Sequence, residues 1–284
     1  MINFRIIPKL EIKNENLVKG VNHEGLRVLG DPLIFISEYL ENNADEIFLQ
    51  DVTASLYETK ISPNFIDEIL KKTFVPVLFG GGISSIDDVS LLLKLGIDRF
   101  SINTAALKKP EIINHISNKI GSANLAVSIE CKKIKDQYFA YGEMGRYNSG
   151  KKIEDWIDEI ISRGAGEIII NSIDNDGTGK GLDLELIKRI NKNISIPLII
   201  SGGVGKKEDI LNIIENYDFS AISIASILHY NVISKDYKLS NTSIGNKNFI
   251  KSLNKKKNIE TCSLKDIKTF LKSSIKKKNL VNII

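Results

Sequence analysis

The 284-residue chain lacks the sequence features of a secreted, membrane or metal-binding protein. Its two cysteines, Cys131 and Cys262, cannot build a disulfide framework, which indicates a reducing cytoplasm. No apolar run approaches the length that spans a bilayer. Residues 1–8 lack the basic region, apolar stretch and cleavage site of a signal peptide. The three histidines show no metal-ligand spacing, so we expect neither a metal nor another cofactor.

The net charge of +4 comes from a local excess near the end of the chain, at Lys255–Lys257 and Lys276–Lys278. A basic tail can bind nucleic acid, but no aromatic stacking pattern accompanies this one. We therefore interpret the tail as a solvated end and expect no nucleic-acid partner.

Features of the first half of the chain recur in the second half. An apolar run that ends in glutamate and is closely followed by lysine occurs at Ile7–Lys13 and again at Ala126–Lys132. Glycine clusters at Gly80–Gly82 and Gly202–Gly203, and the related segments that follow them, repeat at the same offset of about 120 residues. The repeat predicts two half-domains, about 1–122 and 123–284.

Short apolar runs alternate with longer amphipathic segments such as Ile86–Leu95 and Ile153–Arg163. Asp31-Pro32 is typical of a helix start, and Asp183 is a second candidate cap. This alternation predicts a single-domain (β/α)₈ TIM barrel over residues 1–284, and the two equal halves favour it over an open doubly wound sheet. The predicted strands are Arg5–Glu11, Glu46–Asp51, Pro76–Gly80, Arg99–Asn103, Leu125–Cys131, Glu167–Ser172, Leu198–Ser201 and Ala221–Ala225.

One polar segment, Asn231–Thr261, interrupts the alternation and is predicted to be an insertion before a last helix at Leu264–Ser274. It is expected either to pack on the barrel rim or to be partly disordered.

Carboxylates and amides end several of the predicted strands, where barrels of this kind place their chemistry. Glu11 and Glu130 are the predicted catalytic pair, because acid–base chemistry needs one group to donate a proton and another to accept one. We expect Asp174 only to cap a loop. The predicted substrate-binding residues are Lys19, Asp51, Asn171 and Asp176, although a lone lysine such as Lys19 is more often solvated.

Glycine clusters after the third and seventh strands have free backbone N–H groups that can surround an anion. Because each half carries one cluster, the sequence predicts two phosphate sites and a two-ended anionic ligand. The predicted phosphate-binding residues are Gly82, Asn103, Thr104, Gly177, Gly203, Ala225 and Ser226.

Two cations and two anions begin strands at the opposite end of the predicted barrel, namely Arg5, Glu46, Arg99 and Glu167. The residues alone leave two interpretations open. The ring is either an ion-pair plug with little net effect on stability or a gated entrance to the barrel axis.

Eight segments of this chain together resemble the cyclase subunit family of imidazole glycerol phosphate synthase, along nearly the whole length. They are Arg5–Pro8, Val18–Asn22, Gly30–Pro32, Asp51–Ser55, Gly80–Ile83, Ser101–Asn103, Gly164–Ile168 and Asp174–Thr178. The resemblance implies a barrel that receives ammonia from a glutaminase partner and delivers it along its axis to a phosphorylated small-molecule substrate. It implies that the four-charge ring is an ammonia gate, in which Arg99 stands where lysine is common in the family. It also implies that Asp98 contacts the glutaminase.

The chain departs from this family at the catalytic positions. Glu11 and Glu130 stand where the family has aspartates, Lys9 replaces a usual cysteine, and Asn171 replaces a usual threonine. A glutamate carries its carboxylate ~1.5 Å further from the backbone, and a misplacement of ~1 Å can cost on the order of 10²-fold in rate. These departures, together with the segments Asn171–Asp174 and Pro63-Asn64, make the chain resemble a paralogous branch of the family that serves sugar amidation in surface polysaccharide synthesis. That branch, however, often lacks the first carboxylate.

Three hypotheses follow. In the first, the chain is the ammonia-channelling barrel of a sugar-amidation system, with a glutaminase and a sugar amidotransferase as partners. In the second, it is a working cyclase that makes imidazole glycerol phosphate and aminoimidazole carboxamide ribotide. The third, a non-catalytic scaffold, gives no reason for two phosphate sites.

Overall fold

The computed structural model describes residues 4–190, 194–235 and 258–277. Within them, eight parallel strands close into a barrel, since each pairs with the next and the last pairs with the first. This confirms the (β/α)₈ prediction and excludes the open sheet. In order around the barrel, the strands are β1 (Arg5–Lys13), β4 (Ile47–Asp51), β5 (Val77–Gly80), β6 (Arg99–Ile102), β7 (Leu125–Ile134), β10 (Glu167–Ser172), β11 (Leu198–Ser201) and β12 (Ala221–Ile224).

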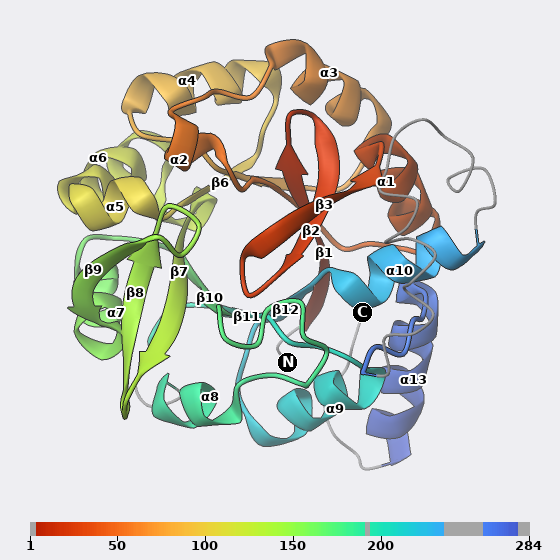
Figure 1. Cartoon of the computed structure of the whole chain (residues 1–284). Coiled ribbons are helices and arrows are strands. Elements are labelled where there is room, and N and C mark those ends of the chain that lie inside the picture. Colours follow the sequence, from red (N-terminus) through yellow and green to blue (C-terminus); the bar gives the residue numbers. More distant parts are fainter. Residues whose placement is uncertain (1–3, 191–193, 236–257, 278–284) are drawn as a thin grey trace.

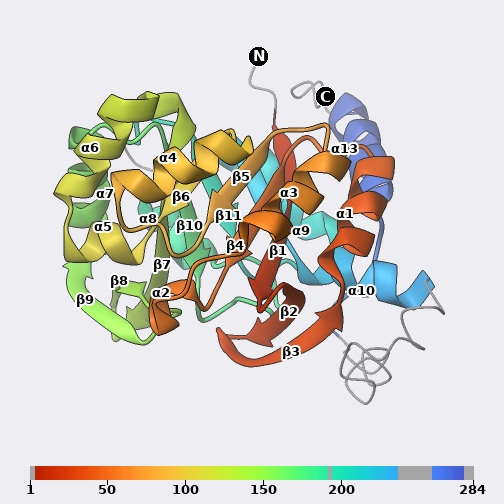
Figure 2. The same cartoon turned by 90° about the horizontal axis from the view of Figure 1, so that it is seen from above.

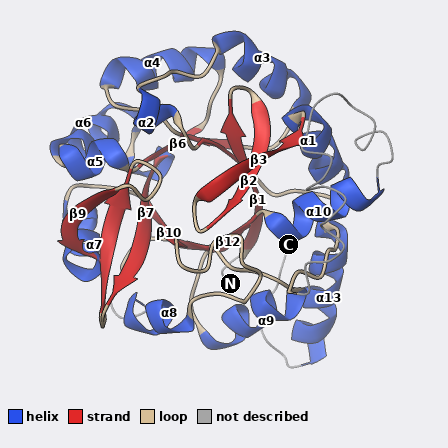
Figure 3. Cartoon of the chain, viewed as in Figure 1, coloured by secondary structure: helices blue, strands red, loops and turns tan. Residues whose placement is uncertain are grey.

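Helices surround the barrel on its outer side (Figure 1; Figure 3). The predicted starts are confirmed at two of them, where Asp31 accepts a hydrogen bond from the Leu33 N–H and Asp183 from the Leu186 N–H. The longer helices are α1 (Pro32–Glu41), α3 (Pro63–Lys72), α4 (Ile86–Leu95), α6 (Glu111–Ile120), α7 (Ile153–Ser162), α8 (Leu184–Ile190), α9 (Lys207–Asn216), α10 (Ser226–Lys235) and α13 (Leu264–Lys277). The short ones are α2 (Ala54–Tyr57), α5 (Thr104–Lys108) and the 3₁₀ turn η1 (Ser122–Asn124).

Two hairpins that the sequence did not predict follow the first strand of each predicted half. β1 continues into β2 (Asn16–Val21) and β3 (Glu24–Gly30), and β7 continues into β8 (Gln137–Gly142) and β9 (Tyr147–Lys152). Both hairpins lie at the same end of the barrel, away from the described N-terminal end of the chain (Figure 2). Their equivalent positions support our proposal of a repeated half-barrel.

The barrel axis is divided into layers by residues that point inward from the strands. A ring of charged side chains lies at the amino ends of the strands. Above it, a tightly buried apolar layer fills the interior, and polar side chains follow at the carboxyl ends. The apolar layer consists of Ile7, Phe48, Leu78, Ala126, Ile169, Ile199 and Ala221, each at most 1% exposed. The outer faces of the same strands pack against the helices, as expected for a parallel sheet that is buried on both faces.

The predicted insertion began too early. Residues 231–235 continue α10, and Val232 and Ile233 are buried there, because the apolar side of this helix extends past Asn231. Residues 236–257, with the basic run Lys255–Lys257, lie outside the described residues. The last predicted helix is confirmed as α13. No described helix is both long and apolar enough to cross a bilayer.

Two phenylalanines of opposite exposure test the packing of the barrel. Phe100 on β6 is fully buried between strands and helices, whereas the side chain of Phe74 is 78% exposed. We expect Phe100→Ala to lower the free energy of unfolding by about 3–5 kcal/mol, because it leaves a cavity in the core. The same change at Phe74 should shift it by less than about 0.5 kcal/mol. Urea unfolding compares the two, and equal effects would contradict the described core.

Candidate active site at the barrel mouth

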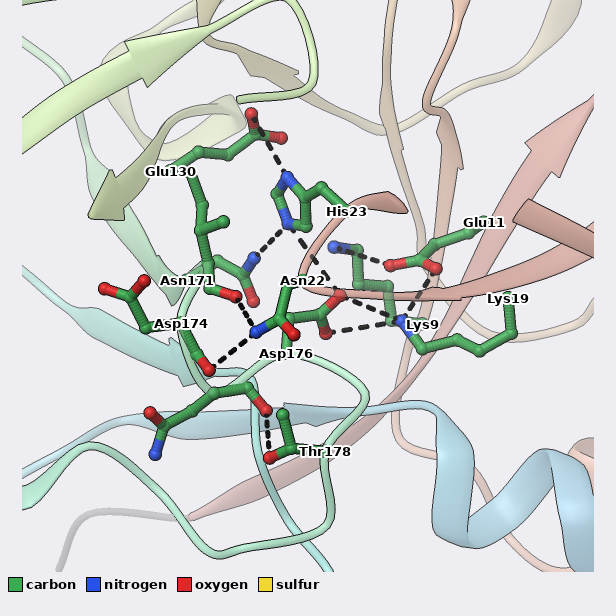
Figure 4. Close-up of polar contacts among 12 residues, drawn as sticks. Lys9, Glu11, Lys19, Asn22, His23, Glu130, Asn171, Asp174, Asp176 and Thr178 are labelled. Carbon is green, nitrogen blue, oxygen red and sulfur yellow. Dashed lines mark hydrogen bonds and ion pairs between the residues drawn. The ribbon is translucent and has the colours of Figure 1, made fainter. Parts of the chain in front are cut away.

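The first predicted catalytic residue, Glu11, lies buried at the end of β1 between two lysines. Its Oε2 accepts a hydrogen bond from Lys19 Nζ at 2.8 Å, and its Oε1 lies 3.4 Å from Lys9 Nζ. Lys19, on β2, is only 1% exposed and also donates to Asp176 at 3.1 and 3.3 Å. The expectation that a lone lysine is solvated is therefore wrong for Lys19, because two buried carboxylates compensate its charge (Figure 4).

These lysines decide the charge of Glu11. Burial alone would raise the pKa of the Glu11 carboxyl, but the charges of Lys19 and Lys9 and the Lys19 hydrogen bond outweigh it and lower the pKa to about 2. The carboxylates of Glu11 and Asp176 in turn raise the pKa of Lys19, against the opposing effect of burial. Glu11 is thus held as an anion throughout the neutral range.

The second predicted catalytic residue, Glu130, faces a histidine instead of a lysine. Glu130 ends the barrel part of β7, and its Oε2 lies 3.8 Å from His23 Nδ1. On the other side of the ring, His23 Nε2 lies 2.8 Å from the Asn171 amide nitrogen and 3.8 Å from Asp176 Oδ2 (Figure 4). The structure therefore brings five of the predicted site residues together, namely Glu11, Glu130, Lys19, Asn171 and Asp176, and adds His23.

His23 reaches this place because the β2–β3 hairpin turns tightly. Asn22 and His23 have φ angles of 52° and 61°, the left-handed pair that a two-residue hairpin turn requires. The Asn22 amide donates to the carbonyls of Ile173 and Asp174, at 2.9 and 2.6 Å, and so fixes the turn to the loop after β10. Gly177 of that loop fits against the hairpin closely: a Cβ there would lie 2.3 Å from the Gly20 carbonyl oxygen.

The first predicted phosphate site lines a cavity of about 320 Å³ at the ends of β4, β5 and β6. Gly82 and Asn103 line it, and Asn103 Oδ1 is buried without a hydrogen-bond partner among the described residues. Thr104 also lines it, but its hydroxyl accepts a hydrogen bond from the Glu143 N–H at 2.9 Å. Glu130 borders the same cavity, so a ligand held there would lie beside Glu130, whereas Glu11 does not line this cavity.

The second predicted phosphate site is much smaller. Its predicted members, Gly177, Gly203, Ala225 and Ser226, enclose a space of about 20 Å³ together with Lys9 and Asp176. The structure thus places the members of each site together, but it gives the two sites different sizes. Between them lies a space of about 10 Å³ beside His23 and the two glutamates, because the hairpin turn fills the middle of the mouth.

Two aspartates near the mouth, Asp51 and Asp174, accept hydrogen bonds from backbone N–H groups. Asp51 borders the large cavity, but its Oδ1 accepts hydrogen bonds from the Thr53 and Ala54 N–H groups at the start of α2. Burial raises the pKa of Asp51 in spite of these bonds. Asp174 accepts a hydrogen bond from the Lys133 N–H at 2.8 Å, which joins the loop after β10 to β7 and does not cap a loop. Among the described residues, no group of three or more His, Cys, Asp or Glu side chains is arranged to hold a metal.

At the opposite end of the axis, the four predicted charges form a closed ring. Arg5 contacts Glu46 at 2.7 Å and Glu167 at 2.5 Å, and Arg99 contacts Glu46 at 2.5 Å and also Glu167. Both carboxylates are almost completely buried, so each depends on its two guanidinium partners to compensate its charge. Nearby, Asp98 Oδ2 accepts a hydrogen bond from the Val77 N–H at 3.3 Å and caps the start of β5.

The sequence interpretation missed His23, although it contained a usable signal. Asn22-His23 separates two runs that are able to pair as strands, and asparagine favours left-handed turns. The contact of Lys9 with Glu11 had a signal as well, since residues two apart on a strand share a face. The position of His23 beside Glu130 had no signal in the sequence, because these two residues are distant in sequence.

Gly177→Ala tests the docking of the hairpin. The added methyl group would collide with the Gly20 backbone, whereas Gly25→Ala meets open space at a similarly positive φ of 59°. We expect Gly177→Ala to release the hairpin and accelerate amide hydrogen exchange over residues 16–30, and Gly25→Ala to leave the exchange outside its own turn unchanged. Equal exchange in both variants would show that the contact does not hold the hairpin.

The lowered pKa of Glu11 predicts a pH-dependent contribution to stability. The value of about 2 lies below the ordinary 4.5, so between these values the unfolded chain binds more protons than the folded one. The stabilisation by Glu11 is therefore complete above pH 4.5 and is lost as the pH falls toward 2. Unfolding of the natural chain and of Glu11→Gln, measured over this range, should show their difference shrinking on acidification. A constant difference would contradict the assignment.

Comparisons with known proteins agree with this geometry. The sequence profile of the family described as "Histidine biosynthesis protein" matches residues 5–234. Imidazole glycerol phosphate synthase subunit HisF of Lactococcus lactis subsp. lactis (strain IL1403) is 40% identical over 238 residues, or 83% of this chain and 92% of the relative. The subunit of the same name from Helicobacter hepaticus (strain ATCC 51449 / 3B1) is 41% identical, covering 81% and 91%. That from Legionella pneumophila is 44% identical, covering 74% and 99%. The chain therefore belongs to the histidine biosynthesis protein family, together with the HisF subunits of imidazole glycerol phosphate synthase.

Proposed function

We propose that the chain is the ammonia-using cyclase subunit of an imidazole glycerol phosphate synthase. One observation carries the proposal: a buried carboxylate site at the mouth and a closed ring of four charges at the base lie on the same barrel axis. The names of its relatives point to the same activity. This favours the second hypothesis from the sequence over the first.

The geometry supports a division of labour along the axis. The ring of Arg5, Glu46, Arg99 and Glu167 closes the base, and the apolar layer above it disfavours ions, because transfer of a charge into apolar surroundings is costly. Ammonia would therefore pass as the neutral molecule once an arginine of the ring moves aside. A glutaminase docked at the base would supply it, with Asp98 beside the contact.

At the mouth, a substrate with two phosphate groups fits the two glycine-lined sites. Backbone N–H groups near Gly82 and Asn103 would hold one phosphate, and those near Gly203 and Ser226 the other. The smaller site, with a volume of about 20 Å³, must widen when its phosphate enters. The substrate, here called an aminated ribulosyl bisphosphate, would carry a ribulosyl phosphate joined to aminoimidazole carboxamide ribotide. Ammonia would replace the ribulosyl carbonyl oxygen, which leaves as water, and closure of the imidazole ring would release imidazole glycerol phosphate and aminoimidazole carboxamide ribotide. Glu130 would exchange protons, and Lys19 with Glu11 would hold fixed opposite charges beside the reacting atoms.

Delivery of ammonia for sugar amidation remains a second candidate, favoured by one specific observation. Both carboxylates at the mouth are glutamates, and Glu11 is held by two lysines. A protein that only delivers ammonia would keep the ammonia entrance, but it would not need Glu11 to act as an acid or base, and the two lysines would hold Glu11 in place. The names of the relatives give this candidate no support. The scaffold hypothesis depended on residues that lie mostly outside the described part, and no observation supports it.

An ammonium-dependent assay distinguishes the two candidates. We expect the purified chain, given ammonium salt and the aminated ribulosyl bisphosphate, to form imidazole glycerol phosphate, detected by chromatography. No product at high enzyme concentration would reject the cyclase.

Glu46→Gln examines the ring in the same assay. It should lower turnover with glutamine and a glutaminase several-fold more than turnover with ammonium salt, because it alters only the entrance. An equal loss in both assays would argue against a gate.

A further inference from the structure

The centre of the mouth carries an uncompensated negative charge. Lys9 and Lys19 bring two positive charges, whereas Glu11, Asp176 and Glu130 bring three negative ones. Lys19 contacts Glu11 and Asp176, and Lys9 contacts Glu11. Within the described chain, no lysine or arginine forms an ion pair with Glu130. A buried carboxylate without a cation is costly, so the position of Glu130 calls for a hydrogen-bond donor.

His23 is the group that faces this carboxylate. His23 Nδ1 and Glu130 Oε2 are both buried, both without a hydrogen-bond partner in the described structure, and 3.8 Å apart. That distance exceeds a hydrogen bond, but rotation of the long glutamate side chain closes it. The ring is held from its other side, where Asn171 donates its amide hydrogen to Nε2.

The contact with Asn171 determines which nitrogen of His23 carries the proton. A nitrogen that accepts a hydrogen bond has no proton of its own, so neutral His23 must carry its proton on Nδ1, the nitrogen directed at Glu130. In this tautomer Nε2 stays the acceptor of the Asn171 amide, and the Nδ1–H is free to donate toward Glu130.

We propose that His23 is a positioning residue for Glu130, held by Asn171 in the tautomer that donates its Nδ1–H to Glu130 Oε2. This leaves Oε1 of Glu130 to exchange one proton with a ligand in the large cavity. Glu130 gains that proton as the ligand loses it, and His23 keeps its own proton throughout. The proposal deepens the proposed function, on which it rests for the identity of the substrate.

The charged groups around His23 are consistent with this role. Glu130 faces it from β7, Asp176 from the loop after β10, and Glu11 and Lys9 from β1. Lys19 neutralises Asp176 and Glu11 from β2. The two carboxylates that could compete for the histidine proton are thus already paired with lysines, and Glu130 is left as its partner.

Two substitutions that both tolerate the left-handed turn at position 23 provide the kinetic test. His23→Gly removes the ring without backbone strain, and His23→Asn returns an amide donor near the position of Nδ1. We expect His23→Gly to lower kcat with ammonium salt on the order of 10- to 100-fold and to shift the limb of the pH–rate profile that reports the exchanging carboxylate to higher pH, because the carboxylate loses its hydrogen-bond donor, while KM changes little. His23→Asn should recover part of kcat and part of the shift. Equal loss in both variants would overturn the proposal.

A double-mutant comparison separates positioning from a structural role. In the Glu130→Gln background, His23→Gly should cause no further loss beyond about twofold, because the group it acts through is gone. The full loss in that background would overturn the proposal. His115→Phe, a change at an exposed histidine on α6, is the control and should leave turnover unchanged.

A spectroscopic measurement decides the proposal without turnover. Nitrogen NMR of the natural chain labelled at histidine should show His23 protonated at Nδ1 and unprotonated at Nε2, and Glu130→Gln should shift the Nδ1 signal but not the signals of His115. An unprotonated Nδ1, or an unshifted signal in Glu130→Gln, would overturn the proposal. If the chain forms no imidazole product but these signals behave as expected, the proposed function fails and the positioning of Glu130 by His23 stands.

Discussion

The buried ammonium of Lys19 organises the mouth of this barrel. It lies on the β2–β3 hairpin and contacts carboxylates from two other parts of the chain, Glu11 on β1 and Asp176 after β10. Removal of any one of these groups would leave a buried charge uncompensated, which typically costs about 3–5 kcal/mol. The ion-pair cluster therefore ties the hairpin to the barrel and brings the hairpin turn, with His23, into the centre of the site.

This arrangement makes the two glutamates chemically different, although they occupy equivalent positions in the two halves. Glu11 is surrounded by cations, and its pKa falls to about 2. Glu130 faces the imidazole of His23. An approximate sequence repeat thus places two glutamates in different electrostatic surroundings, which is a general way to separate acid–base roles.

The barrel axis connects this site with the charged ring at the other end. The ring, the apolar layer and the polar mouth follow each other because alternate residues of parallel strands point inward, so Arg5, Ile7, Lys9 and Glu11 lie along one side of the same axis. A neutral molecule crosses such a sequence of layers more easily than an ion, which agrees with a barrel that passes ammonia.

The sequence by itself determined the barrel, its eight strands, the ring and the residues that line the two proposed anion sites. Each of these depends on local periodicity or on strand order, which the chain carries in short segments. The tertiary structure alone decided that Lys19 is buried, that the first anion site is large and the second small, and that His23 faces Glu130. The contacts of Lys19 with Asp176 and of His23 with Glu130 join residues more than a hundred positions apart, and no local pattern encodes them. The hairpins lie between these cases: their turn residues were visible in the sequence, but only packing against the loop after β10 placed them over the mouth.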